Sequence, residues 1–161
     1  MSPAPTTLAD IMAVFEGSDG DATRALFDQL EKLGPAGVVA LNLFRACKNS
    51  ARAKVYRGGQ RGRGSYRSMA YDRKAWAIDN LADVLGKHAA ALGIAWGWGL
   101  DPNQEFHRHV LYVDAPTGQV SFHTAPRGAG PDYVGGWDGA RGTGAQRICG
   151  WIAQLLQAVP A

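Results

Sequence analysis

The sequence has few cysteines and no long apolar run. Cys47 and Cys149 are its only cysteines. Each lies in an apolar helical pattern, so we expect two small buried thiols in a reducing compartment rather than a disulfide. No apolar run approaches the roughly 20 residues that span a bilayer. The first residues lack a basic start and carry Asp10 within their short apolar run, unlike a signal peptide. We therefore expect a cytoplasmic protein with no membrane partner.

Motifs that cradle phosphates are missing as well. The glycine-rich segment 126–144 contains neither GxxxxGKS nor a GxGxxG that follows a strand. We interpret it as a long loop whose glycines permit tight turns. Loops of this length often carry function, so Asp132, Asp138 and Arg141 are candidates for the rim of a neighbouring site.

The composition is that of one globular domain. With 46% hydrophobic and 19% charged residues, the chain is too apolar to be disordered. A domain of this length buries about 70% of its unfolded surface, so its core needs no metal or disulfide for stability. We expect residues 1–6 to form a flexible tail and residues 7–161 to form a single domain.

Hydrophobic periodicity predicts helices, then a small sheet, then a last helix. The predicted helices cover residues 8–15, a segment capped by Asp21 or Thr23, residues 36–56, residues 72–92 with Asp72 as the cap, and an apolar pattern after residue 144. A short strand is expected near residues 94–100, and a hairpin pairs residues 106–113 with 119–124. This order predicts an α+β fold, in which N-terminal and central helices pack on a small antiparallel sheet with a C-terminal helix.

Positive charge is concentrated in residues 45–74. This segment has ten basic residues and one acidic residue, whereas the rest of the chain has seven basic and thirteen acidic residues. Arg45, Lys48 and Arg52 are spaced by three and four residues, so they share one face of the predicted third helix. That helix should end near Arg57, because the following RGGQRGRGS is too rich in glycine to continue it.

Aromatic residues accompany these arginines: Tyr56, Tyr66 and Tyr71 lie within the basic segment, and Trp76 lies two residues after it. Cations can reach the phosphates of an extended polyanion, and aromatic or guanidinium planes can stack on unpaired bases. The segment therefore predicts a nucleic-acid interface. An acidic protein surface would fit the same charge, and solvated surface charge with no partner is the third interpretation. The predicted contacts are Arg45, Lys48, Arg52, Lys54, Arg57, Arg61, Arg63, Arg67, Arg73 and Lys74.

Three of the four histidines lie in the predicted hairpin, FHRHVLYVDAPTGQVSFHT. His107 and His109 are two residues apart on one strand, so they project to the same side. If Val113 lies opposite Gln119 across the hairpin, then His109 faces His123 and three imidazoles converge. Three histidines with an open fourth position are typical of a site for zinc or another divalent metal.

The other possible register removes this site. If Asp114 pairs with Gln119 instead, His123 lies opposite Val110 and on the other face from His109. Converged histidines could also act without a metal, with His123 as a general base and His109 or Arg108 stabilising a transferring phosphoryl group. A simple polar network on a half-exposed strand is the alternative without function.

The segments PTGQVSFH (116–123) and GGWDG (135–139) resemble a pattern, QVSWH followed by WDG, in a group of small uncharacterised proteins from bacterial genomes and phages. The resemblance covers the C-terminal third and implies a phage or mobile-element setting, without a catalytic role. The leading hypothesis is an accessory protein that binds nucleic acid or another polyanion. The alternatives are a small hydrolase, such as a phosphodiesterase or nuclease, that uses the histidines, and an inhibitor of a host protein, such as an anti-defence protein.

Overall fold

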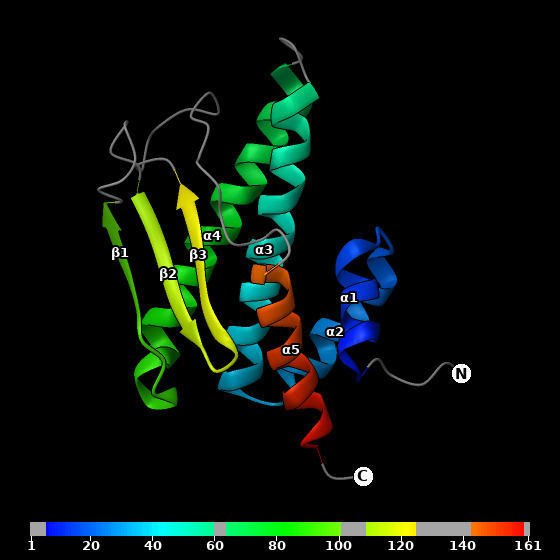
Figure 1. Cartoon of the computed structure of the whole chain (residues 1–161), viewed down its shortest axis with the longest axis vertical. Helices are drawn as coiled ribbons and strands as arrows, with labels where there is room; N and C mark the ends of the chain where they lie inside the picture. Colours follow the sequence, from blue (N-terminus) through cyan, green and yellow to red (C-terminus); the bar gives the residue numbers. More distant parts are fainter. Residues whose placement is uncertain (1–5, 60–63, 101–108, 125–142, 160–161) are drawn as a thin grey trace.

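The computed structural model of the chain describes residues 6–59, 64–100, 109–124 and 143–159 (Figure 1). Its helices are α1 (Leu8–Glu16), α2 (Gly20–Glu31), α3 (Pro35–Gly59), α4 (Gly64–Leu92) and α5 (Thr143–Gln157). The strands β1 (Trp96–Leu100), β2 (His109–Ala115) and β3 (Gly118–Thr124) form one antiparallel sheet in the order β1-β2-β3. The predicted α+β fold with a C-terminal helix is confirmed.

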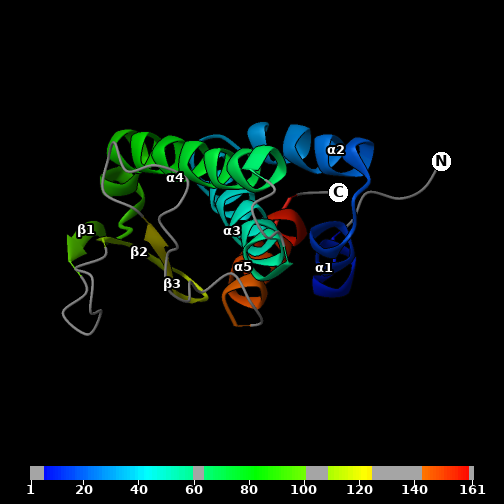
Figure 2. The ribbon, with the colours of Figure 1, turned by 90° about the horizontal axis from the view of Figure 1, so that it is seen from above.

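Helix α3 lies at the centre of the molecule, in contact with α1, α2, α4 and α5. Seen from above, the sheet lies on one side of α3, and α1 and α2 lie on the other (Figure 2). Because neighbours surround α3, side chains are buried on more than one of its faces, as the consecutive buried residues Val39, Ala40 and Leu41 show. Phe44 on α3 joins the N-terminal helices to this core.

The ring of Phe44 is fully buried and packs edge-to-face against two rings from those helices. Its centroid lies 5.3 Å from that of Phe15 on α1 and 5.7 Å from that of Phe27 on α2. Edge-to-face pairs add about 0.5–1.5 kcal/mol each beyond the burial of their surface. The three rings therefore hold α1 and α2 against α3.

The helices α3 and α4 are longer than the sequence predicts. The segment from Arg57 to Asp72 was expected to be largely a loop, but α3 continues to Gly59 and α4 begins at Gly64. The expected cap Asp72 consequently lies inside α4. The two helices pack along each other, and such packing outweighs the cost of about 1 kcal/mol for each helical glycine. Their joined ends project beyond α1, α2 and α5 (Figure 1).

The helix α2 begins earlier than predicted, because its cap is Asp19 rather than Asp21 or Thr23. The Asp19 carboxylate accepts hydrogen bonds from the backbone N–H groups of Asp21 at 2.9 Å and Ala22 at 3.2 Å. These N–H groups lie in the first turn, where they have no carbonyl partner within the helix. The predicted last helix, α5, ends at Gln157, and Val159 beyond it is exposed.

The β2–β3 hairpin closes through a two-residue turn, Pro116 and Thr117, with Ala115 paired to Gly118. Gly118 has a φ of +131°, a conformation that side chains with a Cβ rarely adopt. Helix α5 is fixed to this turn. The Thr117 hydroxyl donates to the carbonyl oxygen of Arg147, and Arg147 Nη1 donates to the carbonyl oxygen of Gln119 at 2.5 Å.

The two cysteines are buried and free, as predicted. Burial, and then the charge of Glu16, raises the pKa of the Cys149 thiol to about 12. Within the described residues, no helix is both long enough and apolar enough to cross a membrane.

Candidate nucleic-acid interface

Most of the predicted basic residues lie on the α3/α4 hairpin. Helix α3 carries five of them, between Arg45 and Arg57, and α4 carries Arg67, Arg73 and Lys74. The antiparallel packing of α3 and α4 brings most of these positions onto the half of the hairpin nearest to residues 60–63, which we call the distal half (Figure 1); Arg45 lies just before the midpoint of α3. Arg61 and Arg63 lie outside the described residues.

The described basic side chains differ in how available they are to a ligand. Arg52 and Arg73 are exposed. Lys74 is only 7% exposed and already interacts with another group of the protein. We therefore do not count Lys74 in the surface open to a polyanion, although its sequence position predicted it there.

Lys48 connects α3 to the end of α1. Its ammonium donates hydrogen bonds to the carbonyl oxygens of Val14 at 3.0 Å and Gly17 at 2.7 Å. Partial burial, followed by the nearby charge of Arg52, lowers the pKa of Lys48 below its ordinary value. Lys48 thus neutralises the negative end of the α1 dipole while it contributes positive charge to the surface beside it.

Arg45 lies between two aromatic rings from different helices. Its guanidinium carbon is 5.1 Å from the centroid of the Phe27 ring on α2 and 5.6 Å from that of the Trp76 ring on α4. Both distances are in the range of cation–π interactions. Arg45 is half-buried, whereas Trp76 is 59% exposed. The guanidinium therefore links the α2–α3 side of the molecule to an open indole on α4.

A cleft of about 530 Å³ lies between α2 and α3. Its basic side chains are Arg24, Arg45, Lys48 and Arg52, and its acidic side chains are Asp28 and Glu31. Arg24 was not predicted, because it is outside the basic segment and only the pairing of α2 with α3 brings it there. Among the described residues, Arg24 and Arg52 have no ion-pair partner.

Charge is distributed unevenly along this cleft. Asp28 and Glu31 lie toward the end of α2 that connects to α3, where the two backbones approach closely. A Cβ on Gly37 would lie 1.8 Å from the carbonyl oxygen of Leu30, so only glycine fits there. Arg24 and Arg52 lie farther from this connection, toward the distal half of the hairpin. The end of the cleft that lies farther from the α2–α3 connection is therefore its cationic end.

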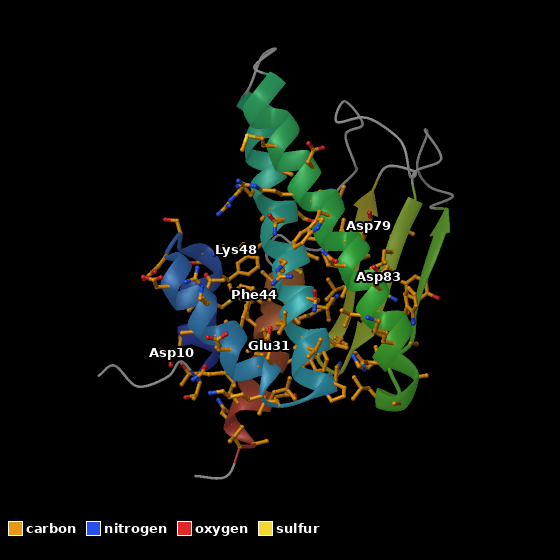
Figure 3. The ribbon with its side chains drawn as sticks, turned by 180° about the vertical axis from the view of Figure 1, so that it is seen from behind. Asp10, Glu31, Phe44, Lys48, Asp79 and Asp83 are labelled. Carbon is orange, nitrogen blue, oxygen red and sulfur yellow. The ribbon has the colours of Figure 1, made fainter. Side chains whose placement is uncertain are left out.

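Acidic residues lie on both sides of the basic pair Arg73 and Lys74 on α4: exposed Asp72 precedes the pair, and Asp79 and Asp83 follow it. Asp79 and Asp83 lie on α4 in the half that is nearer to the sheet connection, while Lys48 lies across on α3 (Figure 3). Asp83 is exposed. An extended anion would be repelled from this part of α4 and attracted to the distal half.

The hairpin register does not bring the predicted histidines together. Asp114 pairs with Gln119, and Val110 pairs with His123, whereas His109 pairs with Thr124. Positions 109 and 123 consequently lie on opposite faces of the sheet. This is the second of the two registers considered from the sequence, in which His109 does not face His123 across the hairpin.

His107 and the candidate rim residues Asp132, Asp138 and Arg141 lie outside the described residues. Within the described part, no group of three or more His, Cys, Asp or Glu side chains could hold a metal ion. The fourth histidine, His88, is half-buried on α4. The described residues thus give no support to chemistry at the hairpin.

Comparison of the chain with protein-family models, with curated proteins and with solved structures gave no match. The interpretation of the cationic cleft therefore rests on its own geometry and charge.

Proposed function

We propose that the protein binds nucleic acid, or another extended polyanion, with the cationic end of the α2–α3 cleft and the distal half of the α3/α4 hairpin. The observation that carries this proposal is the cleft itself. Arg24, Lys48 and Arg52 line its cationic end, and Arg45 connects it to Trp76. Part of the positive charge of the segment 45–74 therefore lies on a concave surface, where several cations can contact one ligand.

The magnitude of the effect follows from counterion release. Each phosphate that a basic side chain neutralises steepens the dependence of log K on log salt by about 0.9 for duplex DNA and about 0.7 for single strands. Lone surface ion pairs contribute only about 0–1 kcal/mol, so binding needs several contacts at once. Several contacts are available here, because three cations lie at one end of the cleft and exposed Arg73 lies on the neighbouring helix α4.

The test compares two double variants that remove the same charge. Arg24→Ala with Arg52→Ala removes cleft cations, whereas Lys32→Ala with Lys87→Ala removes exposed cations elsewhere. Binding of fluorescent nucleic-acid oligomers is measured by anisotropy over a salt series. We expect the cleft variant to bind about tenfold or more weakly at low salt, with a salt slope reduced by about 1–2. The control variant should retain both.

Equal losses in the two variants would mean that net charge alone attracts the oligomer, and no loss in either would overturn the proposal. Binding of polyglutamate as tightly as nucleic acid would contradict a nucleic-acid ligand and favour an acidic protein surface. The hydrolase and the inhibitor of a host protein, both suggested by the sequence, gain no supporting contact from the described residues.

A further inference from the structure

Trp76 is an exposed indole that the cationic cleft does not explain. Its side chain is 59% exposed, and Met69, seven residues earlier on the same face of α4, is 47% exposed. Exposed Arg73 lies between them along the helix. A large aromatic ring left in water beside cations is typical of surfaces that bind a planar partner.

Arg45 holds this indole from one side. The guanidinium is 5.6 Å from the ring centroid and is itself placed by the Phe27 ring. Fewer orientations are therefore open to the indole before a ligand arrives, so binding costs less side-chain entropy than for a free tryptophan. The indole is therefore preorganised for stacking. The cations beside it, Arg45 and Arg73, can bind phosphates on either side of a stacked base.

We propose that the nucleic acid bound by this surface is single-stranded and that Trp76 stacks on one of its unpaired bases. This inference rests on the proposed function. In a duplex, both faces of each internal base are covered by neighbouring base pairs, so an indole has nothing to stack on. An unpaired base in DNA or RNA offers a free face, and a stack of this kind changes affinity by about 5- to 150-fold.

The experiment measures binding of the full chain to a single-stranded oligomer of about 12 nucleotides and to a fully paired, blunt-ended duplex of the same length. The variants are Trp76→Ala, Trp76→Phe and, as a control on the same face, Met69→Ala. Circular dichroism and thermal unfolding confirm that each variant is folded. Tryptophan fluorescence reports stacking directly, because a stacked base quenches an indole.

We expect Trp76→Ala to weaken single-strand binding by about 5- to 150-fold and to leave duplex binding within about twofold. Trp76→Phe should recover part of the affinity, and quenching by the single strand should be lost in both Trp76 variants. Met69→Ala should change single-strand affinity much less than Trp76→Ala does.

Three results would overturn the inference. If Trp76→Ala weakens single-strand and duplex binding equally, the residue acts by positioning Arg45 rather than by stacking. If the unaltered protein binds both ligands and Trp76→Ala is neutral, strand selectivity fails while the proposed function survives. If the unaltered protein binds neither ligand at low salt, both proposals fail together.

Discussion

The ammonium of Lys48 lies 2.7 Å from the carbonyl oxygen of Gly17, so that α3 holds the C-terminal end of α1 in place. A second hydrogen bond, to the carbonyl oxygen of Val14, reinforces this contact. The same side chain lines the cationic cleft. One lysine therefore serves the packing of the N-terminal helix and the charge of the proposed binding surface.

Replacing this lysine should weaken the docking of α1. Hydrogen bonds from a charged donor contribute about 1.5–3 kcal/mol, so Lys48→Met should lower the free energy of unfolding by roughly that amount. Denaturant titration followed by circular dichroism measures the change. Lys87→Met, at an exposed position on α4, is the control and should stay within about 0.5 kcal/mol of the parent. Equal stability of the two variants would contradict the role assigned to Lys48.

The raised pKa of Cys149 predicts a loss of stability in alkaline solution. Burial raises the pKa of this thiol from 9.0 to about 12, with a smaller effect from Glu16. Between these values the unfolded chain releases the thiol proton and the folded chain keeps it, so stability falls as the pH rises through this window. The slope from this one group is at most about 1.4 kcal/mol per pH unit.

The measurement is the thermal unfolding midpoint of the parent and of Cys149→Ala between neutral pH and pH values above 9. Other groups titrate in the same range, so the difference between the two proteins isolates the thiol. We expect the parent to lose stability more steeply than the variant. Parallel curves would show that the thiol keeps an ordinary pKa in the folded protein.

The hairpin register can be tested with a cross-strand disulfide. Tyr112 and Ser121 pair directly across β2 and β3, so Tyr112→Cys with Ser121→Cys should oxidise readily, because paired Cα atoms lie about 4.5–5.5 Å apart. Tyr112→Cys with Val120→Cys is the control, since residue 120 faces the core and pairs with Val113. Free-thiol titration reads out the result. Faster oxidation of the control would restore the register in which His109 faces His123.

Local patterns predicted much of the fold. The apolar spacing of α4 and α5 identified core residues such as Ile78, Leu81 and Ile148, which are all buried. The predicted end of α3 was wrong, because the glycines near residues 58–64 were taken to break the helix. Packing between α3 and α4 supplies a stabilising term that no local propensity contains.

The candidate site was less predictable, because it depends on contacts between helices. The helical spacing of Arg45, Lys48 and Arg52 put them on one face, and they do line one cleft. The sequence gives no local signal for the carbonyl groups that Lys48 binds, nor for the position of Arg24 in the cleft, because both depend on how separate helices pack. The register of the hairpin did have a local signal in the sequence. Gly118 directly follows Pro116 and Thr117, and a glycine there suits a two-residue turn that ends with a positive φ.

The helices that carry the proposed surface are neighbours in the chain, and this has a consequence for the order of folding. α2 contacts α3, and α3 contacts α4. The contact between α5 and the first described residue spans 151 positions, where Gln157 Nε2 donates to the carbonyl oxygen of Thr6. Contacts between near neighbours form faster than distant ones. We expect the cationic cleft to assemble while the C-terminal helix is still being synthesised, so a growing chain could attract polyanions before its fold is complete.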